Sequence, residues 1–309
     1  MPGFPTDTDL QKVARRHRRK ARPVKPNRRE EARLRRAVSD LWKSVLWPAT
    51  ERIKQLVQQK ASPAAIAREI EEALYLANTT YSRAAKNIID SWMLGVDREV
   101  SIAIQRSMHQ ALGIDVTSVL QRPDVAEALQ TAGLRAANLI TSIPQEYLGR
   151  VAQAVADNFS GVDLPEGRTL LQQIQHIGGV SYKRAKLISR DQTSKLTAQL
   201  NQTRQQAVGI EIYRWRTVHD ERVVGNPVGI SPTGNSKHGD HYHMDGKLFR
   251  WDDNTVYSDD DGTTWKSRPK EWSQNVPGWD IQCRCWAEPE VDAGHVVEMI
   301  QEQRAGYLL

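Results

Sequence analysis

Cysteine is nearly absent from this chain of 309 residues, and its scarcity excludes a disulfide framework. The two cysteines, Cys283 and Cys285, are separated by a single residue, whereas small secreted domains are held together by several spaced pairs. The N-terminus also lacks the apolar stretch of a secretory leader. These absences predict synthesis in a reducing cytoplasm.

Long apolar runs are missing as well. No stretch approaches the roughly 18 apolar residues that a membrane-spanning helix needs, and only 39% of the residues are hydrophobic. Phosphate-binding glycine loops, a dinucleotide-binding fingerprint and a Ser–His–Asp arrangement are also lacking. The sequence therefore predicts a soluble protein with room for two domains and no catalytic residues.

Positive charge is concentrated near the N-terminus. Residues 11–36 contain thirteen Lys or Arg and two Glu, which gives them a net charge of +11. The net charge of the whole chain is +6, so the remaining residues carry a net charge of −5. Because residues 1–27 contain four prolines and few apolar side chains, they predict a disordered basic arm. Such an arm either binds DNA phosphates without reading sequence or remains a solvated tail. The candidate DNA-binding residues are Arg15, Arg16, Arg18, Arg19, Lys20, Arg22, Arg28 and Arg29.

From Arg28 to about Val208, apolar residues recur at helical spacing and predict a region that is nearly all helix. Pro48 is expected to kink or restart the first helix, and Pro63, Pro123 and Pro144 to begin others. The expected later helices cover residues 64–79, 81–112, 123 onward, 145–158 and 170–207. The last is expected to be a pair hinged at residues 178–179, acting either as a structural elbow or as a phosphate-gripping hairpin.

At Gly209 the pattern changes to short extended segments separated by polar loops. Strands are expected at residues 210–218, 247–251 and 281–286, with tight turns at 245–246 and 261–262. The predicted fold class is α+β, with a long helical N-terminal and middle region followed by a small C-terminal domain with short antiparallel strands. The expected boundaries are 1–27 for the arm, 28–165 for the helical region, 166–290 for the C-terminal domain and 291–309 for a tail.

Both cysteines and six of the nine tryptophans lie between residues 209 and 288. On a strand, Cys283 and Cys285 would share one face at the limit of disulfide reach, so they should remain unbridged. Three uses stay open: a packed or hydrogen-bonded structural cluster, a zinc site, and a hydrolytic metal site. The zinc set would add His241 with His219 or His243, and the hydrolytic set would combine His241, His243 and Asp245.

The same residues follow the order of a known motif series. In this chain the series reads Arg190-Asp191-Gln192-Thr193, Gly209, Tyr213, Trp215, Thr217, Asp220-Glu221-Arg222, His241, Met244, Asp245, Gly246, Phe249, Pro277, Cys283, Arg284 and Cys285. Over residues 181–288 the chain thereby resembles the phage Mu F-like minor head protein family, also called the phage head morphogenesis family. One departure is the extra loop Val223–Asp240, which leaves open whether His219, His241 or His243 is the equivalent histidine.

The resemblance implies a minor capsid protein, made in the host cytoplasm and located inside the virion near the portal. It implies the portal protein, a major capsid or scaffolding protein and double-stranded DNA as partners, with no membrane during assembly. Proteins of this family are thought to aid head assembly, hold DNA near the portal or leave with the genome. The helical region would supply the docking surface, and no cofactor is expected beyond a structural zinc ion. The alternative is a metal-dependent nuclease or toxin-like effector built on the C-terminal domain.

Overall fold

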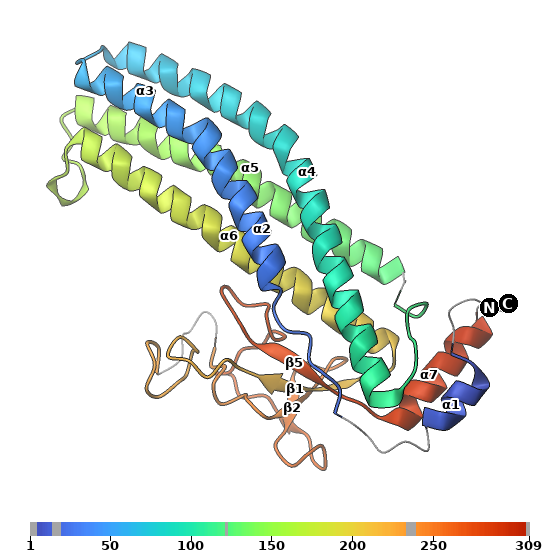
Figure 1. Cartoon of the computed structure of the whole chain (residues 1–309). Coiled ribbons are helices and arrows are strands. Elements are labelled where there is room, and N and C mark those ends of the chain that lie inside the picture. Colours follow the sequence, from blue (N-terminus) through green and yellow to red (C-terminus); the bar gives the residue numbers. More distant parts are fainter. Residues whose placement is uncertain (1–4, 14–19, 121–122, 233–238, 307–309) are drawn as a thin grey trace. The chain divides into compact units, whose positions relative to one another are not determined.

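The computed structural model describes residues 5–13, 20–120, 123–232 and 239–306. It is an α+β protein with long helices and a five-stranded antiparallel sheet (Figure 1). The chain divides into two compact units, which we treat separately. The sheet unit comprises residues 1–27, 95–131 and 193–309, and the helical unit comprises residues 28–94 and 132–192. Within the described residues, no helix is both long and apolar enough to cross a bilayer.

Long helices form most of the chain, and three of them contribute to both units. The helical segments are α1 (Asp7–Val13), α2 (Arg28–Leu41), the π-helix η1 (Trp42–Leu46), α3 (Trp47–Gln58), α4 (Pro63–Leu112), α5 (Pro123–Phe159), the 3₁₀ helix η2 (Pro165–Gly167), α6 (Leu170–Ala207) and α7 (Ala293–Gly306). The expected start at Pro63 is confirmed, because the hydroxyl of Ser62 accepts a hydrogen bond from the Ala65 N–H at 3.2 Å. The expected end before Gly113 is confirmed too.

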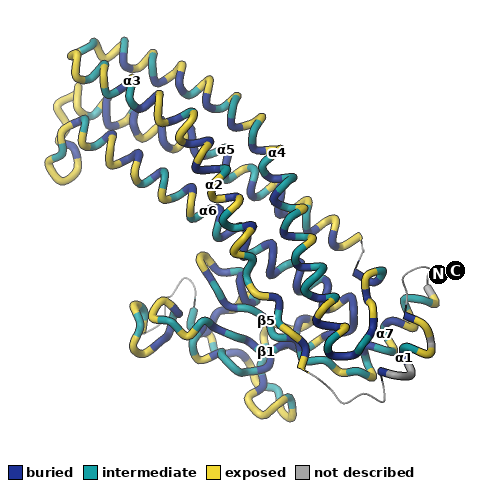
Figure 2. The backbone as a smooth tube through the Cα atoms, in the orientation of Figure 1, coloured by how far each residue is buried: buried dark blue, intermediate teal, exposed yellow. Residues whose placement is uncertain are grey.

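The helical unit is a bundle whose apolar residues follow the helical period. Leu34, Val38, Trp42 and Leu46 recur every four residues, and each is buried. Figure 2 shows the same alternation along each helix, with buried positions turned toward neighbouring helices and exposed ones outward. Burying these stripes stabilises helices that would be marginal alone.

Three expected helix breaks are absent. Residues 64–79 and 81–112 belong to the single helix α4, Pro144 lies inside α5, and the glycines at 178 and 179 lie inside α6. The reason is tertiary packing, which outweighs the weak local preference of these residues. At Pro48 the expectation holds: η1 precedes it, and the Trp47 N–H bonds to the carbonyl of Trp42, five residues back.

The sheet unit is built on five antiparallel strands. They are β1 (Ile212–Arg216), β2 (Leu248–Arg250), β3 (Val256–Ser258), β4 (Lys266–Ser267) and β5 (Trp286–Glu290), arranged in the order β4-β3-β2-β1-β5. Tyr213 and Trp215 of β1 point into a fully buried aromatic core, while Arg214 and Arg216 pair on the other face with glutamates of β5. The indole N–H of Trp251 donates to Gln205 Oε1 at 3.0 Å, which ties this core to α6.

The strand expected at residues 281–286 is wrong, because β5 begins only at Trp286. Residues 281–285 instead form a turn in which Gln282 has a φ of +60°. A tight turn of this kind competes with extended pairing, and alternation in three residues was too short a signal to exclude it. The cysteines therefore owe their proximity to a turn and not to one face of a strand.

The described N-terminal residues, 5–13 and 20–27, differ from the expected disordered arm, whereas residues 1–4 and 14–19 lie outside the described ones. Residues 7–13 form α1, which packs against α7, and Leu10 and Val13 are each 2% exposed. Ala21 and Val24 are buried as well. These few apolar side chains are buried against residues distant in the sequence, and the composition of the segment gives no sign of such contacts. The C-terminal segment, expected as a tail, is docked through Val296 and Ile300, which are both buried.

Candidate functional site: a buried histidine and two cysteines

One imidazole and two thiols meet inside the sheet unit. His241 Nδ1 lies 3.4 Å from Cys285 Sγ and 3.5 Å from Cys283 Sγ. The three side chains offer ligand atoms within 4.8 Å of one another. Each residue is less than one-tenth exposed, and the cysteines are free thiols. The arrangement is a closed cluster and not an open surface site.

The position of His241 is fixed by one backbone hydrogen bond and two ring contacts. Its backbone N–H donates to the carbonyl of Val224 at 3.0 Å, which fixes the start of the loop before β2. Trp215 of β1 meets the ring edge-on, with centroids 5.5 Å apart and planes at 88°. The far ring nitrogen, Nε2, lies 3.1 Å from Asp280 Oδ2. The near nitrogen is thereby aimed at the two sulfur atoms.

Asp280 is itself positioned by polar neighbours. Ser273 donates its hydroxyl to Oδ2 at 2.5 Å, and Asn275 donates its side-chain N–H to Oδ1 at 2.6 Å. Burial acts to raise the pKa of Asp280, but the bonds from His241, Ser273 and Asn275 hold the pKa below its usual value. The ionised carboxylate is a strong acceptor for the imidazole.

The two thiols have different environments despite their proximity. Cys283 Sγ accepts hydrogen bonds from the backbone N–H groups of Gly278 and Cys285, both at 3.4 Å. The Cys285 thiol, together with His241, lowers the pKa of Cys283 well below the usual value, against the effect of burial. Burial, reinforced by the neighbouring Cys283, raises the pKa of Cys285. Against the effect of burial, Asp280 and Cys283 raise the pKa of His241 to about 10.

The other two candidate histidines do not join the cluster. His219 is mostly exposed and its Nε2 lies 3.2 Å from Asp245 Oδ2. His243 is also mostly exposed and pairs with Asp240 at 2.5 Å. The four-ligand set with a second histidine is therefore not assembled, and neither is the hydrolytic set of His241, His243 and Asp245. His241 alone of the three reaches the cysteines, and the other two side chains are mostly exposed.

Sequence reasoning missed Asp280 and its partners. Their spacing carries one usable signal: Asp280 lies three residues before Cys283, and the Cys283 N–H donates to its carbonyl at 2.9 Å to close the turn. Ser273 and Asn275 belong to a polar loop without a pattern of its own. Their contribution is visible only once the loop is folded.

The remaining motif residues form the frame around the cluster. Arg284 bonds to both carboxylate oxygens of Asp220, and Asp220 Oδ1 accepts the backbone N–H of Arg222 at 3.0 Å. Asp245 Oδ1 accepts the Thr217 N–H at 2.8 Å. The Gly246 N–H donates to the carbonyl of Trp215, and the φ of +79° at this turn favours glycine. These contacts fix the loops that carry His241 and the cysteines.

The candidate DNA-binding residues fall into three groups. Arg15, Arg16, Arg18 and Arg19 lie outside the described residues. Lys20 and Arg22 are exposed on the sheet unit, while Arg28 and Arg29 are exposed at the start of α2 in the helical unit. The nearby Lys25 ammonium lies 5.2 Å from the ring centroid of Trp286. The described cations are thus presented to solvent from an ordered backbone.

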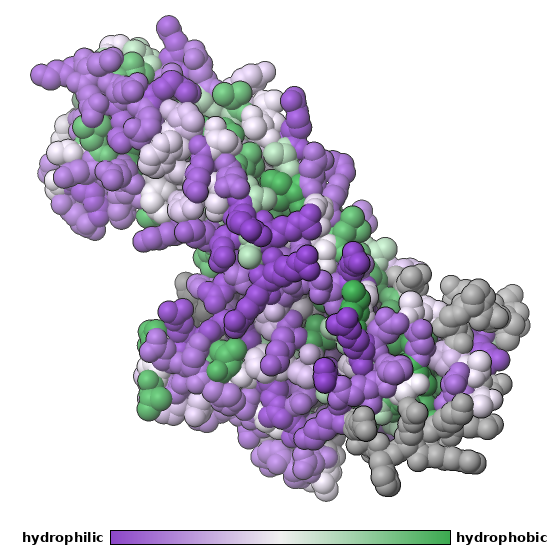
Figure 3. All heavy atoms as spheres, in the orientation of Figure 1, coloured by the Kyte–Doolittle hydropathy of each residue, from purple (hydrophilic) through white to green (hydrophobic). Residues whose placement is uncertain are grey.

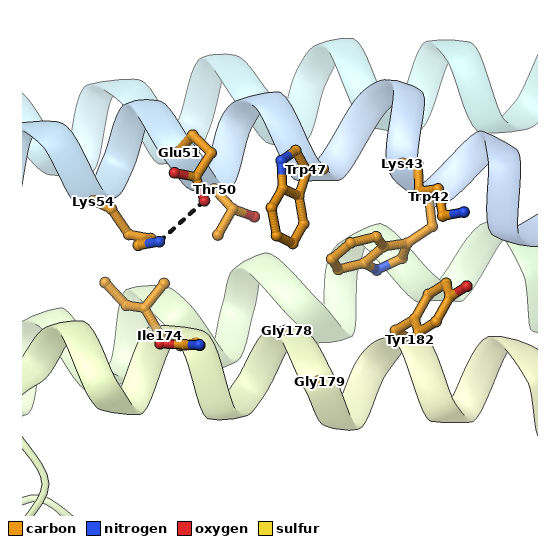
Figure 4. Close-up of a pocket in the computed structure, with 11 residues that line it drawn as sticks. Trp42, Lys43, Trp47, Thr50, Glu51, Lys54, Ile174, Gly178, Gly179 and Tyr182 are labelled. Carbon is orange, nitrogen blue, oxygen red and sulfur yellow. Dashed lines mark hydrogen bonds and ion pairs between the residues drawn. The ribbon is translucent and has the colours of Figure 1, made fainter.

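A second candidate site is an apolar groove in the helical unit (Figure 4). Its volume is about 390 Å³, and Trp42, Trp47 and Tyr182 form its aromatic walls. Gly178 and Gly179 form its floor on α6, where they leave space that larger side chains would fill. Trp47 is 53% exposed, and Lys43 stands at the rim with no ion pair among the described residues. We refer to this feature as the Trp groove.

Comparison with known proteins gives one relative. An uncharacterized protein of Haemophilus influenzae is 27% identical to this chain over 286 residues, which is 89% of the chain and 56% of that protein. The chain therefore spans about half the length of the curated relative that it matches. No family model matches the chain. No solved structure matches it either.

Proposed function

We propose that this chain is a minor head protein of a tailed bacteriophage, located inside the capsid beside the portal and in contact with packaged DNA. The observation that carries the proposal is that the motif residues form the contacts that hold the loops of this domain together. Arg284 pairs with Asp220, Asp245 accepts the N–H of Thr217, and Gly246 donates to the carbonyl of Trp215. Together these contacts hold one small fold around the closed cluster. A framework of this kind suits an assembly protein that presents surfaces to several partners.

The closed cluster favours assembly over catalysis. A nuclease must bring a phosphodiester to its metal, and a catalytic metal keeps a reachable coordination position. His241, Cys283 and Cys285 are each less than one-tenth exposed, so a DNA strand has no path to them without rearrangement. No specific observation therefore favours the nuclease alternative, and the plasmid-nicking assay described below tests it.

The charge distribution suits a chain that contacts packaged DNA. Thirteen Lys or Arg in residues 11–36 would neutralise phosphates and release their counterions, which gives binding without sequence preference. The described cations Lys20, Arg22 and Arg28 are exposed and available for such contacts. Figure 3 shows that hydrophilic side chains also cover most of the visible face, with apolar patches between them.

The Trp groove supplies the docking surface that the proposal requires. Its occupant would be a segment of the portal protein that inserts a bulky apolar side chain between Trp42 and Trp47. Lys43 at the rim has no ion pair within the described part of the chain, while Glu51 already pairs with Lys54 at 3.0 Å. A carboxylate next to the inserted side chain would complement Lys43. The groove therefore fits an acidic and apolar portal segment.

The proposal is tested on particles made by the phage or prophage that encodes the chain. Quantitative mass spectrometry of purified virions, before and after DNA ejection, should find a few to some tens of copies per particle. Loss of these copies on ejection would add delivery with the genome. Absence from virions and from procapsids would overturn the capsid role. Plasmid nicking by the intact chain with magnesium, manganese or zinc would favour the nuclease alternative.

A further inference from the structure

We propose that His241, Cys283 and Cys285 bind one Zn²⁺ ion, through Nδ1 of the imidazole and the two thiolate sulfurs. The site would be structural, and it stands independently of the proposed function. Both sulfurs approach the same ring nitrogen, at 3.4 Å and 3.5 Å. Both contacts are within hydrogen-bonding distance, since each thiol carries an S–H that donates to the ring nitrogen or to the other sulfur. A metal ion between the three atoms also accounts for both.

The distances fit a tetrahedral zinc ion. With Zn–S bonds of roughly 2.3 Å and a Zn–N bond of roughly 2.0 Å at tetrahedral angles, each N···S edge is about 3.5 Å long. The two observed edges differ from this value by about a tenth of an ångström or less. All three ligand atoms lie within 4.8 Å of one another, which also allows the S···S edge of such a site. The protein needs little rearrangement to accept the ion.

The atoms behind the ligands match those found around bound zinc. A metal-ligating histidine typically donates its other ring N–H to a carboxylate, and here Nε2 lies 3.1 Å from Asp280 Oδ2. Ser273 and Asn275 hold that carboxylate in turn. Backbone N–H groups of Gly278 and Cys285 donate to Cys283 Sγ and stabilise its negative charge. The donor set of two thiolates and one imidazole selects zinc over magnesium or calcium, which prefer oxygen.

Three protein ligands leave the fourth position to a small molecule. Among the described residues, no further His, Cys, Asp or Glu joins the group. Cys285, Ser194 and Gly278 border a cavity of about 10 Å³. A cavity of roughly this size accommodates a single water molecule. The three ligand residues are each less than one-tenth exposed, so the ion would serve the fold.

The role of the ion follows from the segments that it joins. His241 lies in the loop before β2, and the cysteines lie in the turn before β5, on opposite sides of β1 in the sheet. His241 and Cys283 are 42 positions apart in the chain. A metal bridge across that distance in the chain would restrict the unfolded state and stabilise the sheet unit.

The test uses the full reduced chain, stripped of metal and titrated with Co²⁺ and then Zn²⁺. We expect about one ion per chain, a thiolate-to-cobalt charge-transfer band, intense tetrahedral d–d bands and displacement of cobalt by zinc. The Asp280→Asn substitution should weaken zinc binding by about 10- to 100-fold, because it alters the partner of the ligating histidine. The matched control His243→Ala removes an exposed histidine outside the cluster and should leave the affinity unchanged.

Two results would overturn the proposal. One is a folded wild-type chain that shows no charge-transfer band with excess cobalt and retains no zinc after gel filtration, which would leave a hydrogen-bonded cluster only. The other is equal binding by wild type and the Cys283→Ser and Cys285→Ser variants, which would place the ion elsewhere. Because the wild-type spectrum decides the question by itself, misfolding of a serine variant does not obscure it. Neither result depends on whether the chain is found in virions.

Discussion

Arg284 and Asp220 form a two-pronged ion pair, in which both terminal guanidinium nitrogens lie 2.5 Å from a carboxylate oxygen. The two residues are 64 positions apart. Their pairing connects the turn that carries the cysteines to the loop that follows β1. Geometry of this kind is specific to arginine, since lysine presents a single ammonium group.

We predict that Arg284→Lys destabilises the chain by about 1 kcal/mol, because lysine keeps the charge but loses one of the two parallel bonds. Arg284→Ala should cost at least as much. Urea unfolding followed by tryptophan fluorescence measures the difference in the free energy of unfolding. Lys270→Ala, at an exposed position without an ion pair among the described residues, is the control. Equal stability of Arg284→Lys and wild type would show that the pair contributes little.

Two glycines should respond in opposite ways to alanine. Gly149 is exposed inside α5, and a Cβ there meets no atom within 4 Å, so Gly149→Ala should stabilise the chain by about 0.5–1 kcal/mol. Gly209 follows α6 with a φ of +76°, and its Cβ would lie 2.9 Å from Met299 Cγ. Gly209→Ala should therefore destabilise by more than about 1 kcal/mol. Thermal and urea unfolding of both variants measures the change in stability. A change of the same sign in both variants would contradict the prediction.

Asp115 should make stability depend on acid pH. Bonds from the hydroxyl and backbone N–H of Thr117 lower the pKa of Asp115 in the folded chain. Because the pKa of Asp115 is lower in the folded chain than in the unfolded chain, its ionised carboxylate stabilises the fold above the unfolded-state pKa of about 3.9. This stabilisation is lost as the pH falls through the folded-state pKa. We predict that wild type exceeds Asp115→Ala in stability at neutral pH and that this difference shrinks below about pH 4. A difference that stays constant from neutral to acid pH would refute the prediction.

The basic segment should control DNA affinity through charge alone. Replacing Arg15, Arg16, Arg18, Arg19, Lys20 and Arg22 with Gln should weaken duplex binding and reduce the salt slope of log K by up to about 5. Deleting residues 1–36 would be a poor test, because it also removes Leu10, Val24 and Leu34 from the core. Fluorescence anisotropy over a range of salt concentrations measures the slope.

A charge-matched control separates this effect from net charge. It replaces six exposed cations elsewhere with Gln, namely Lys60, Arg68, Arg83, Arg106, Arg150 and Lys270. This variant has the same net charge as the arm variant and should retain most of the wild-type slope. Equal losses in the two variants would mean that DNA binding is a property of overall charge.

The Trp groove should control binding to the portal protein. Trp47→Ala removes one aromatic wall, and we expect it to weaken portal binding by at least about tenfold, as burial of an aromatic anchor would require. Because Trp47 is 53% exposed, the change should affect folding little. Tyr75→Ala, at a 78% exposed aromatic position of α4 outside the groove, is the control. Biolayer interferometry with purified portal protein makes the measurement, and equal affinities of Trp47→Ala and wild type would remove the groove from the interface.

Local signals in the sequence were sufficient for several features. Pro63 marks the start of α4, and the change of pattern at Gly209 marks the start of the strand region, because each signal depends on residues close in the chain. Pro144 and the glycines at 178 and 179 were misleading for the same reason. Their local preference is a fraction of the free energy gained by packing the helices around them.

The cluster required information that the sequence does not carry locally. Three histidines were compatible with the cysteines by composition, and only the folded loops select His241. Asp280, Ser273 and Asn275 were not identified, because their role depends on where two loops meet. The motif series contains His241 and both cysteines, whereas the choice of His241 among the three histidines came from tertiary structure.

The sheet unit draws on three stretches of chain: residues 1–27, 95–131 and 193–309. During synthesis, the first stretch leaves the ribosome long before α7, the helix against which α1 packs. The helical unit ends at residue 192 and has all of its residues available earlier. Its bundle can form while the rest of the chain is still being translated, since local helical contacts form fast. The N-terminal helix must wait for its partner, because α7 is the last helix that the structure describes.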